Sequence, residues 1–409
     1  MKTEDTNEGA RGGPSRGSLA AAAVAAVLFA AGAVWFGDED RFGSRAGIVF
    51  LLGGAFGYVL QRSRFCFLCI LRDFFEERDA RGILGILAAL AVGLLGYLVL
   101  MSSWVYDPSA GHTPPGAHIG PVSWVLVLGG LVFGWGMALS GSCISAQLYR
   151  LGEGSVLSPV ALAGTAAGFV LGFLAWNTLY LRALATAPVV WLPERWGYGG
   201  ALAVSFLVLG AAAVWLLTRL RPEPAEPGEA LGAPPYTLRT LLRAVFVRRW
   251  PAWAGGIFVG LIAAVAYYRA EPLGVTAQIG SWSRQAGTAA GVVPGRMEGL
   301  DGFAGCATAV GAHWLSENGI FITGLVLAGF VGGLASGRFR LQRKRPAEYA
   351  LALLGGVFLG FGSMISLGCT VGTLLSGIHA MALSGWVFAA FVVLGVWTGL
   401  PLKRRFESD

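Results

Sequence analysis

Three of the five cysteines end the same sequence motif, and this repetition is the strongest indication of chemistry in the chain. The motif is G-x3-G-x5-S-x2-C, and its copies end at Cys66, Cys143 and Cys369. The second and third copies align without a gap, 226 residues apart (369 − 143). A lone cysteine in an apolar run is usually only a small hydrophobic residue. Because the thiol recurs at one position in three copies, we interpret it as functional.

The glycines and the cysteines of the motif lead to different predictions. Glycines four residues apart let helices approach closely in lipid, so they predict helix packing. The cysteines lie where apolar runs are interrupted, for example just before Gly372 and Thr373. Helices broken at membrane depth occur where the backbone lines a cavity or is buried in protein. We therefore expect short broken helices at the cysteine motifs, with the thiols along a substrate path.

The chemistry of these thiols favours an anion that contains sulfur. A thiol near a helix N-terminus and an arginine, such as Cys66 beside Arg64, is polarised towards thiolate in a site that favours anions. Except for His379, the histidines lie far from the motif cysteines, so we expect no metal site. We expect no cofactor and no catalytic residues, and the sequence contains no G-x4-G-K-[ST] phosphate-binding loop.

Other polar residues of the motif blocks are candidates for supporting roles. Ser140 and Ser366 could donate hydrogen bonds to the substrate, although a serine in a membrane helix more often bonds to its own backbone. Arg64 could offset the charge of an anion, or it could act only as a topology signal at the membrane edge.

A fourth copy of the motif is degenerate. Gly256 and Gly260 keep the glycine spacing, but a gapless alignment puts Arg269 at the position of the first motif cysteine. We name Cys306 as the candidate thiol for this quarter of the molecule. This choice rests on its position in the chain.

The amino-acid composition requires a membrane. Of the 409 residues, 55% are hydrophobic and 13% are charged, about half the charged fraction of a soluble domain. Long stretches without charge predict spans at 18–36, 46–62, 82–103, 124–142, 157–177, 199–218, 252–270, 318–336, 349–366 and 380–402. We therefore predict an all-α polytopic membrane protein with about nine to ten transmembrane helices. The composition excludes a soluble enzyme, a nucleic-acid-binding protein and a secreted disulfide scaffold for the whole chain.

The basic residues predict the orientation of these spans. With ten spans, the clusters of Lys and Arg that give the net charge of +7 all fall on one side, which predicts that both termini are cytoplasmic. The first span could instead be a signal peptide, but its apolar run is longer than the usual 7–15 residues, so we favour a retained helix.

The motif directions divide the chain into two halves. The copies ending at Cys66 and Cys143 run from outside to inside, and the copy ending at Cys369 runs the opposite way, which is an inverted repeat typical of transporters. We predict a disordered tail at 1–17, a first transmembrane half at 18–218, a cytoplasmic linker rich in Pro and Arg at 219–251, a second half at 252–402 and a basic tail at 403–409.

Several blocks resemble the YeeE/YedE sulfur transport family. Residues 63–66, 140–143 and 271–276 are similar to its shorter blocks, and 337–386 resemble its C-terminal signature, the most specific part. The likeness covers about residues 46–402. It implies a bacterial inner-membrane protein that imports thiosulfate or a related inorganic sulfur species.

The resemblance also implies a role for the motif cysteines. In that family three cysteines hand the anion along a constricted path by thiol hydrogen bonds without a lasting covalent bond, and they map to Cys66, Cys143 and Cys369. Cys69 and Cys306 are additional thiols, and Leu367 stands where a double glycine is commoner. The implied partners are the lipid bilayer, the anion and a cytoplasmic sulfur-carrier protein, with no nucleic acid.

Three alternatives remain at this point. Some relatives are associated with selenium, so the substrate could be a selenium species. Cys66 and Cys69 form C-x-x-C, which could serve a membrane thiol–disulfide or sulfurtransferase enzyme. The chain could also be a structural protein with inert thiols, in which case single Cys→Ala changes would leave function intact.

Overall fold

The structure is a computed structural model, and it describes residues 15–218, 249–305, 314–341 and 343–408. Nearly all of the predicted tail at 1–17 and of the predicted linker at 219–251 therefore lies outside the described residues. Cys306 lies outside them as well.

The described residues are almost entirely helical, and ten helices are long and apolar enough to cross a membrane. They are α1 (Arg16–Phe36), α3 (Ala46–Ser63), α5 (Arg81–Trp104), α6 (Trp124–Ser140), α8 (Leu157–Leu179), α9 (Leu192–Leu217), α11 (Ala252–Arg269), α13 (Glu317–Ala335), α14 (Pro346–Ile365) and α16 (Leu383–Ser408). Within the described ranges, β structure is limited to two isolated bridges. The predicted all-α membrane fold is confirmed.

Shorter elements connect these helices or follow directly from them. They are α2 (Glu39–Phe42), α4 (Phe67–Glu77), η2 (Pro108–Ala110), α7 (Ile144–Gly152), the π-helix η3 (Tyr180–Leu184), α12 (Ala277–Ala289), η4 (Leu300–Gly302), the π-helix η5 (Thr370–Ser376) and α15 (Gly377–His379). Two boundaries differ clearly from the sequence prediction. α16 continues to Ser408, so the predicted basic tail at 403–409 is mostly helical instead of following the last span. α9 begins at Leu192, before the predicted 199, because a kink at Gly197 (φ 65°) sets its first turn apart.

Helices from the two halves of the sequence interlock. The most extensive contacts pair α3 with α13, α5 with α11, α6 with α16 and with α14, and α8 with α14. Each pair joins a helix before residue 218 to one after residue 252. The pairs are also equivalent under the motif repeat, since α3–α13 corresponds to α11–α5 and α6–α16 corresponds to α14–α8. This packing is what a pseudo-twofold relation between the halves produces.

The motif glycines make these close contacts. A Cβ on Gly57 would lie closer than 3.0 Å to the backbone of Leu325 in α13, and one on Gly360 would lie equally close to the backbone of Thr165 in α8. The degenerate fourth copy behaves in the same way, because Gly256 meets the backbone of Gly85 in α5. The prediction that these glycines serve helix packing is confirmed.

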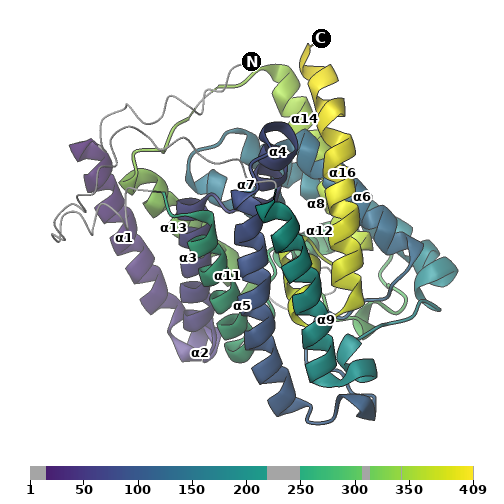
Figure 1. The fold of residues 1–409 in the computed structure, drawn as a ribbon. Coiled ribbons are helices and arrows are strands. Elements are labelled where there is room, and N and C mark those ends of the chain that lie inside the picture. The colour runs from purple at the N-terminus through teal and green to yellow at the C-terminus, as the bar shows by residue number, and fades with distance from the viewer. Residues whose placement is uncertain (1–14, 219–248, 306–313, 342, 409) are drawn as a thin grey trace.

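The bundle has two ends, which we name by the chain termini. α1 begins and α16 ends at the same end, which we call the terminal face (Figure 1). α4 and α7 lie near this face, and the loop between α5 and α6 lies at the opposite face (Figure 1). α3 and α6 therefore run towards the terminal face, and α14 runs away from it.

The glycine contacts predict the effect of adding a single methyl group. Gly360→Ala should lower the free energy of unfolding by about 1–3 kcal/mol, because its Cβ meets the backbone of α8, which cannot move aside as a side chain could. Gly210→Ala is the matched control, since no atom lies within 4 Å of its Cβ. Thermal unfolding in detergent should show a lower Tm for the first variant only. Equal values would contradict the packing role of Gly360.

Candidate functional site

The three motif cysteines occupy equivalent places in the fold. Cys66 is the N-cap of α4, Cys143 is the N-cap of α7, and Cys369 directly precedes η5. Each therefore lies at a break between a long helix and a shorter one. Their side chains are shielded from solvent, with exposed fractions of 0%, 0% and 1%. The predicted broken helices at the cysteine motifs are present.

The motif serines stabilise these helix breaks. The hydroxyl of Ser140 donates to the carbonyl oxygens of Gly136 (2.7 Å) and Ser142 (3.0 Å). Ser366 makes the equivalent bonds to Gly362 (2.6 Å) and Gly368 (3.1 Å). Both hydroxyl protons thus serve carbonyl groups at the end of the preceding helix. This geometry favours the structural interpretation of Ser140 and Ser366.

Side chains from the short helices that follow also form hydrogen bonds at the same two breaks. Gln147 donates from Nε2 to the carbonyl oxygen of Ser140 (3.2 Å), and Thr373 donates to that of Ser366 (3.2 Å). These two donors are also 226 positions apart, like the cysteines that precede them. The inverted repeat therefore extends to hydrogen bonds that the motif itself does not contain.

Two of the motif thiols are in direct contact. Cys66 forms side-chain hydrogen bonds with Cys143 and with Cys69. Cys143 also interacts with the hydroxyl of Ser145 (3.2 Å) and with the backbone N–H groups of Phe67 and Ala146. Those two N–H groups belong to the first turns of α4 and α7. The Cys143 sulfur therefore lies where the positive ends of two helices meet, which is an environment that stabilises negative charge.

Arg150 is a charged group close to these thiols, and it was not among the site residues expected from the sequence. Its Nη2 lies 3.2 Å from the Cys69 sulfur, and its Nη1 donates to the carbonyl oxygen of Gly141 (3.2 Å). It connects α7 with both α4 and the break after α6. The signal available in the sequence was an arginine seven residues after Cys143 in an otherwise uncharged block. Arg64, which the sequence analysis selected, ends α3 in the left-handed region (φ 51°) with its side chain exposed.

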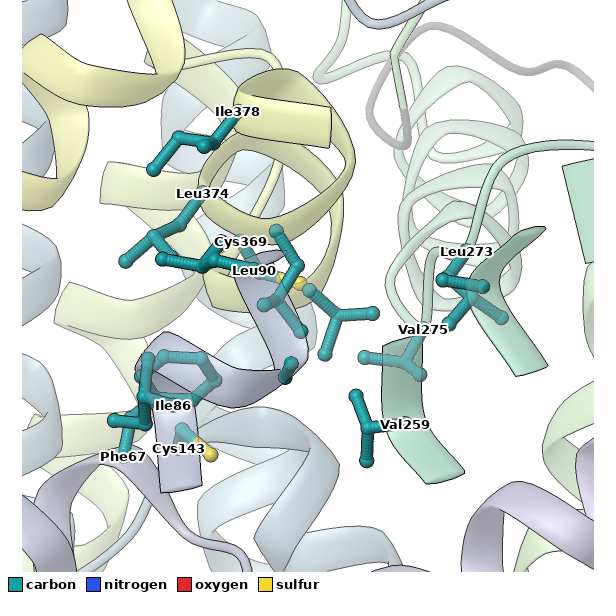
Figure 2. Close-up of a cluster of buried hydrophobic side chains, with 14 of the residues drawn as sticks. Phe67, Ile86, Leu90, Cys143, Val259, Leu273, Val275, Cys369, Leu374 and Ile378 are labelled. Carbon is teal, nitrogen blue, oxygen red and sulfur yellow. The ribbon is translucent and has the colours of Figure 1, made fainter. Parts of the chain in front are cut away.

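Apolar side chains surround the thiols. Cys66, Cys143 and Cys369 belong to one buried hydrophobic cluster that includes Leu90 and Val259. Figure 2 shows the sulfur atoms of Cys143 and Cys369 pointing towards the side on which Val259, Leu273 and Val275 lie. Leu374 and Ile378, beyond Cys369, extend the same cluster (Figure 2). The thiols are therefore the polarisable members of a dry, apolar region.

The fourth helix break lies later in the chain than the gapless alignment placed it. α11 ends at Arg269, whose side chain is exposed, and the next helix, α12, has Thr276 as its N-cap. α11 and α12 pack against the molecule as α3 and α4 do, so Thr276 holds the place that Cys66 holds in the first half. The displacement is seven residues (276 − 269), because α11 is three residues longer at its end than α3 is, and the connection to the next helix is four residues longer.

The segment that contains Cys369 is covered on the side of the opposite face. The hydroxyl oxygen of Ser384 accepts the N–H of Gly120 (3.2 Å), and Nδ1 of His118 lies 3.0 Å from the carbonyl oxygen of Gly372. Burial lowers the pKa of His118, so the imidazole is neutral at neutral pH and Nδ1 carries the donated proton. The adjacent cavity, lined by Ser366 and Leu367, has a volume of about 10 Å³, barely enough for one water molecule. The structure is therefore closed on this side.

The arrangement is better suited to brief binding of a soft, polarisable anion than to binding of a hard ion. Thiols are weak donors with polarisable sulfur, and the surrounding apolar side chains strengthen electrostatic attraction to helix ends. Within the described residues, no group of three or more His, Cys, Asp or Glu side chains could hold a metal ion.

Comparison with known proteins agrees with this interpretation. The sequence model of the family described as "Sulphur transport" matches residues 62–398. The chain is 26% identical over 358 residues to the thiosulfate transporter TsuA of Escherichia coli (strain K12), covering 85% of this chain and 92% of that protein. It is 28% identical over 362 residues to the thiosulfate transporter TsuA of Spirochaeta thermophila, covering 85% and 96%. A shorter match, 29% over 177 residues and 42% of this chain, is to the probable transporter YedE of Escherichia coli (strain K12).

Burial predicts which thiols react with a water-soluble maleimide. In a Cys306→Ser background, Cys69 should be modified faster than Cys66, Cys143 and Cys369, because only its side chain is partly exposed among these four. Mass spectrometry of peptides from the detergent-solubilised protein, sampled over time, measures the four rates separately. Modification of Cys143 at the rate of Cys69 would contradict the closed structure.

Proposed function

The chain belongs to the sulphur transport family, and from this membership and its three buried cysteines we propose that it imports thiosulfate or a closely related inorganic sulfur anion. The observation that carries the proposal is the contact between Cys66 and Cys143 at the meeting N-termini of α4 and α7. The two relatives that cover 85% of this chain are both named thiosulfate transporters.

The physical problem is the cost of taking a divalent anion through a medium of low polarity. An ion loses its hydration there, and that loss is large unless protein groups replace the water. The N–H groups of Phe67 and Ala146 supply partial positive charge beside Cys143, and the guanidinium of Arg150 supplies positive charge beside Cys69, which contacts Cys66. A path with weak donors and partial charges binds the anion without holding it too tightly to leave.

We propose that the anion moves from thiol to thiol without forming a covalent bond. Cys369 lies at the break of a helix that runs away from the terminal face, and Cys66 and Cys143 lie at breaks of helices that run towards it. The anion would meet Cys369 first and the pair Cys143 and Cys66 afterwards, exchanging one S–H hydrogen bond for the next. No electron or proton is transferred in this scheme, so the thiols are unchanged after each passage.

The proposed direction assigns the faces of the molecule. The terminal face would be cytoplasmic and the protein would lie in the bacterial inner membrane, because the basic clusters at 338–345 and 403–405 lie at that face. The two halves at 18–218 and 252–402 would be joined by a cytoplasmic linker at 219–251. A sulfur-carrier protein that receives the anion would then bind at this face, and a selenium anion is the alternative cargo.

A specific observation favours a second candidate function, a thiol–disulfide or sulfurtransferase enzyme. Cys66 and Cys69 are in hydrogen-bonding contact within one turn of α4, and Arg150 lies 3.2 Å from the Cys69 sulfur. A cation beside a thiol is a feature of reactive cysteines. The two candidates differ in which cysteine is indispensable, since the enzyme requires Cys69 and the transport path does not.

Uptake of radiolabelled thiosulfate into proteoliposomes separates these candidates. Cys143→Ala and Cys369→Ala should each reduce the initial uptake rate at least about ten-fold, because each removes a donor that replaces water around the anion. Cys69→Ser is the matched control and should keep most of the uptake. An excess of sulfate or selenite added with the label reports the selectivity.

The outcomes distinguish the proposals. Wild-type protein that accumulates label while both alanine variants do not supports the cysteine path. Label that never enters, or alanine variants with wild-type rates, contradicts it. Loss of activity in Cys69→Ser alone would favour the enzyme.

A further inference from the structure

One buried hydroxyl group stands apart from the bonded serines of the helix breaks. The side chain of Thr276 is 0% exposed, and its Oγ1 has no hydrogen-bond partner among the residues that the structure describes. Other buried hydroxyls share this property among the described residues, and two of them, those of Ser142 and Thr370, adjoin Cys143 and Cys369 in the chain. Buried polar groups in folded proteins are nearly always paired, because an unpaired one costs free energy. Three such groups at three helix breaks indicate a ligand that pairs with them.

Thr276 lies at a helix start that directly follows residues of the buried cluster around the thiols. It is the N-cap of α12, a helix of 13 residues, yet its side chain makes no capping hydrogen bond. Threonine is a common N-cap because its hydroxyl usually makes that bond. The residues just before it, Leu273 and Val275, lie in the same buried cluster as Cys143 and Cys369 (Figure 2). The hydroxyl is therefore not used to cap its helix, and the residues just before it adjoin the region of the proposed path.

The backbone around Thr276 is held by its neighbours. Ser376, from the segment after Cys369, donates to the carbonyl oxygen of Leu273 (2.9 Å). Asn318 donates from Nδ2 to the carbonyl oxygen of Gly274 (2.7 Å) and accepts the N–H of Gln278 (3.1 Å). These bonds connect the fourth break to the Cys369 segment and to α13. The backbone on both sides of Thr276 is thus held in place by hydrogen bonds.

Comparison with the other copies of the repeat indicates a role for Thr276. Three helix breaks carry a thiol, and the fourth, between α11 and α12, carries Thr276 where its counterpart between α3 and α4 carries Cys66. We propose that Thr276 is the fourth substrate-contacting group, and that its hydroxyl binds an oxygen of the transported anion. This inference rests on the proposed function.

The two chemically different ends of thiosulfate explain why both thiols and a hydroxyl would contact it. One end of the anion is a soft sulfur, and the other carries three oxygens that accept strong hydrogen bonds. Thiols suit the sulfur end, and an O–H donor suits the oxygen end. With one break carrying a hydroxyl in place of a thiol, the path can hold both ends at once and so prefer thiosulfate over an anion that has only one kind of end.

Removal of the hydroxyl tests the inference. Thr276→Val keeps the shape and deletes the donor, so the initial uptake of thiosulfate at low concentration should fall about ten-fold, whereas Thr276→Ser should stay within about two-fold of wild type. Thr165→Val is the matched control, since that buried hydroxyl donates to its own helix at Ala161 (2.9 Å), and it should transport normally. Size-exclusion profiles and Tm values report whether each variant folds.

A second measurement does not depend on transport by the valine variant. In a background where only Cys69 and Cys306 are replaced by serine, so that the three path cysteines are kept, thiosulfate should protect the thiol introduced by Thr276→Cys from a small maleimide, as measured by mass spectrometry of the peptide that contains it. Should Thr276→Val not fold, comparison of Thr276→Ala with Thr276→Ser isolates the same hydroxyl. Wild-type uptake in a folded valine or alanine variant would overturn the inference and leave the proposed function standing. Failure of the wild type to take up thiosulfate would instead overturn the proposed function.

Discussion

A helix that breaks inside a membrane must satisfy its freed backbone groups within the protein, and this constraint governs the whole structure. The breaks after α6 and α14 meet it in the same way. The motif serine binds the carbonyls at the end of the long helix, and Gln147 or Thr373 binds the carbonyl of that serine. Because the backbone is satisfied locally, the first N–H groups of the next helix can face the interior. The cysteines lie where those N–H groups begin.

Breaks of this kind are stable only if protein surrounds them, and the motif glycines make that possible. They allow α3, α6, α11 and α14 to contact the backbones of helices from the other half of the chain. The interlocked halves exclude both water and lipid from the three motif thiols, which are at most 1% exposed. The same glycine-to-cysteine motif therefore encodes the packing and the position of the chemical group in one segment.

The interior that results combines low polarity with a few fixed partial charges. Helix N-termini and Arg150 attract an anion, and apolar neighbours such as Val275 and Leu374 offer it no strong competing bond. A hydrated ion such as sulfate has more hydration to lose and no soft sulfur for the thiols to meet. In the path that we propose, selectivity would come from the protein groups that replace water around the anion, and these groups would be thiols and hydroxyls instead of full charges.

The sequence alone determined the membrane fold, the spans and the repeated cysteines, because each is a local pattern of hydropathy or spacing that survives without knowledge of neighbours. It also identified the glycines as packing residues. The tertiary structure decided which groups meet: it brought Arg150 to Cys69, left Arg64 exposed, and placed Thr276 at the fourth break. Those facts depend on the lengths of connections and on contacts between segments far apart in the chain. A gapless alignment cannot supply them, since an insertion of seven residues before Thr276 leaves the packing of α11 unchanged but moves the equivalent position.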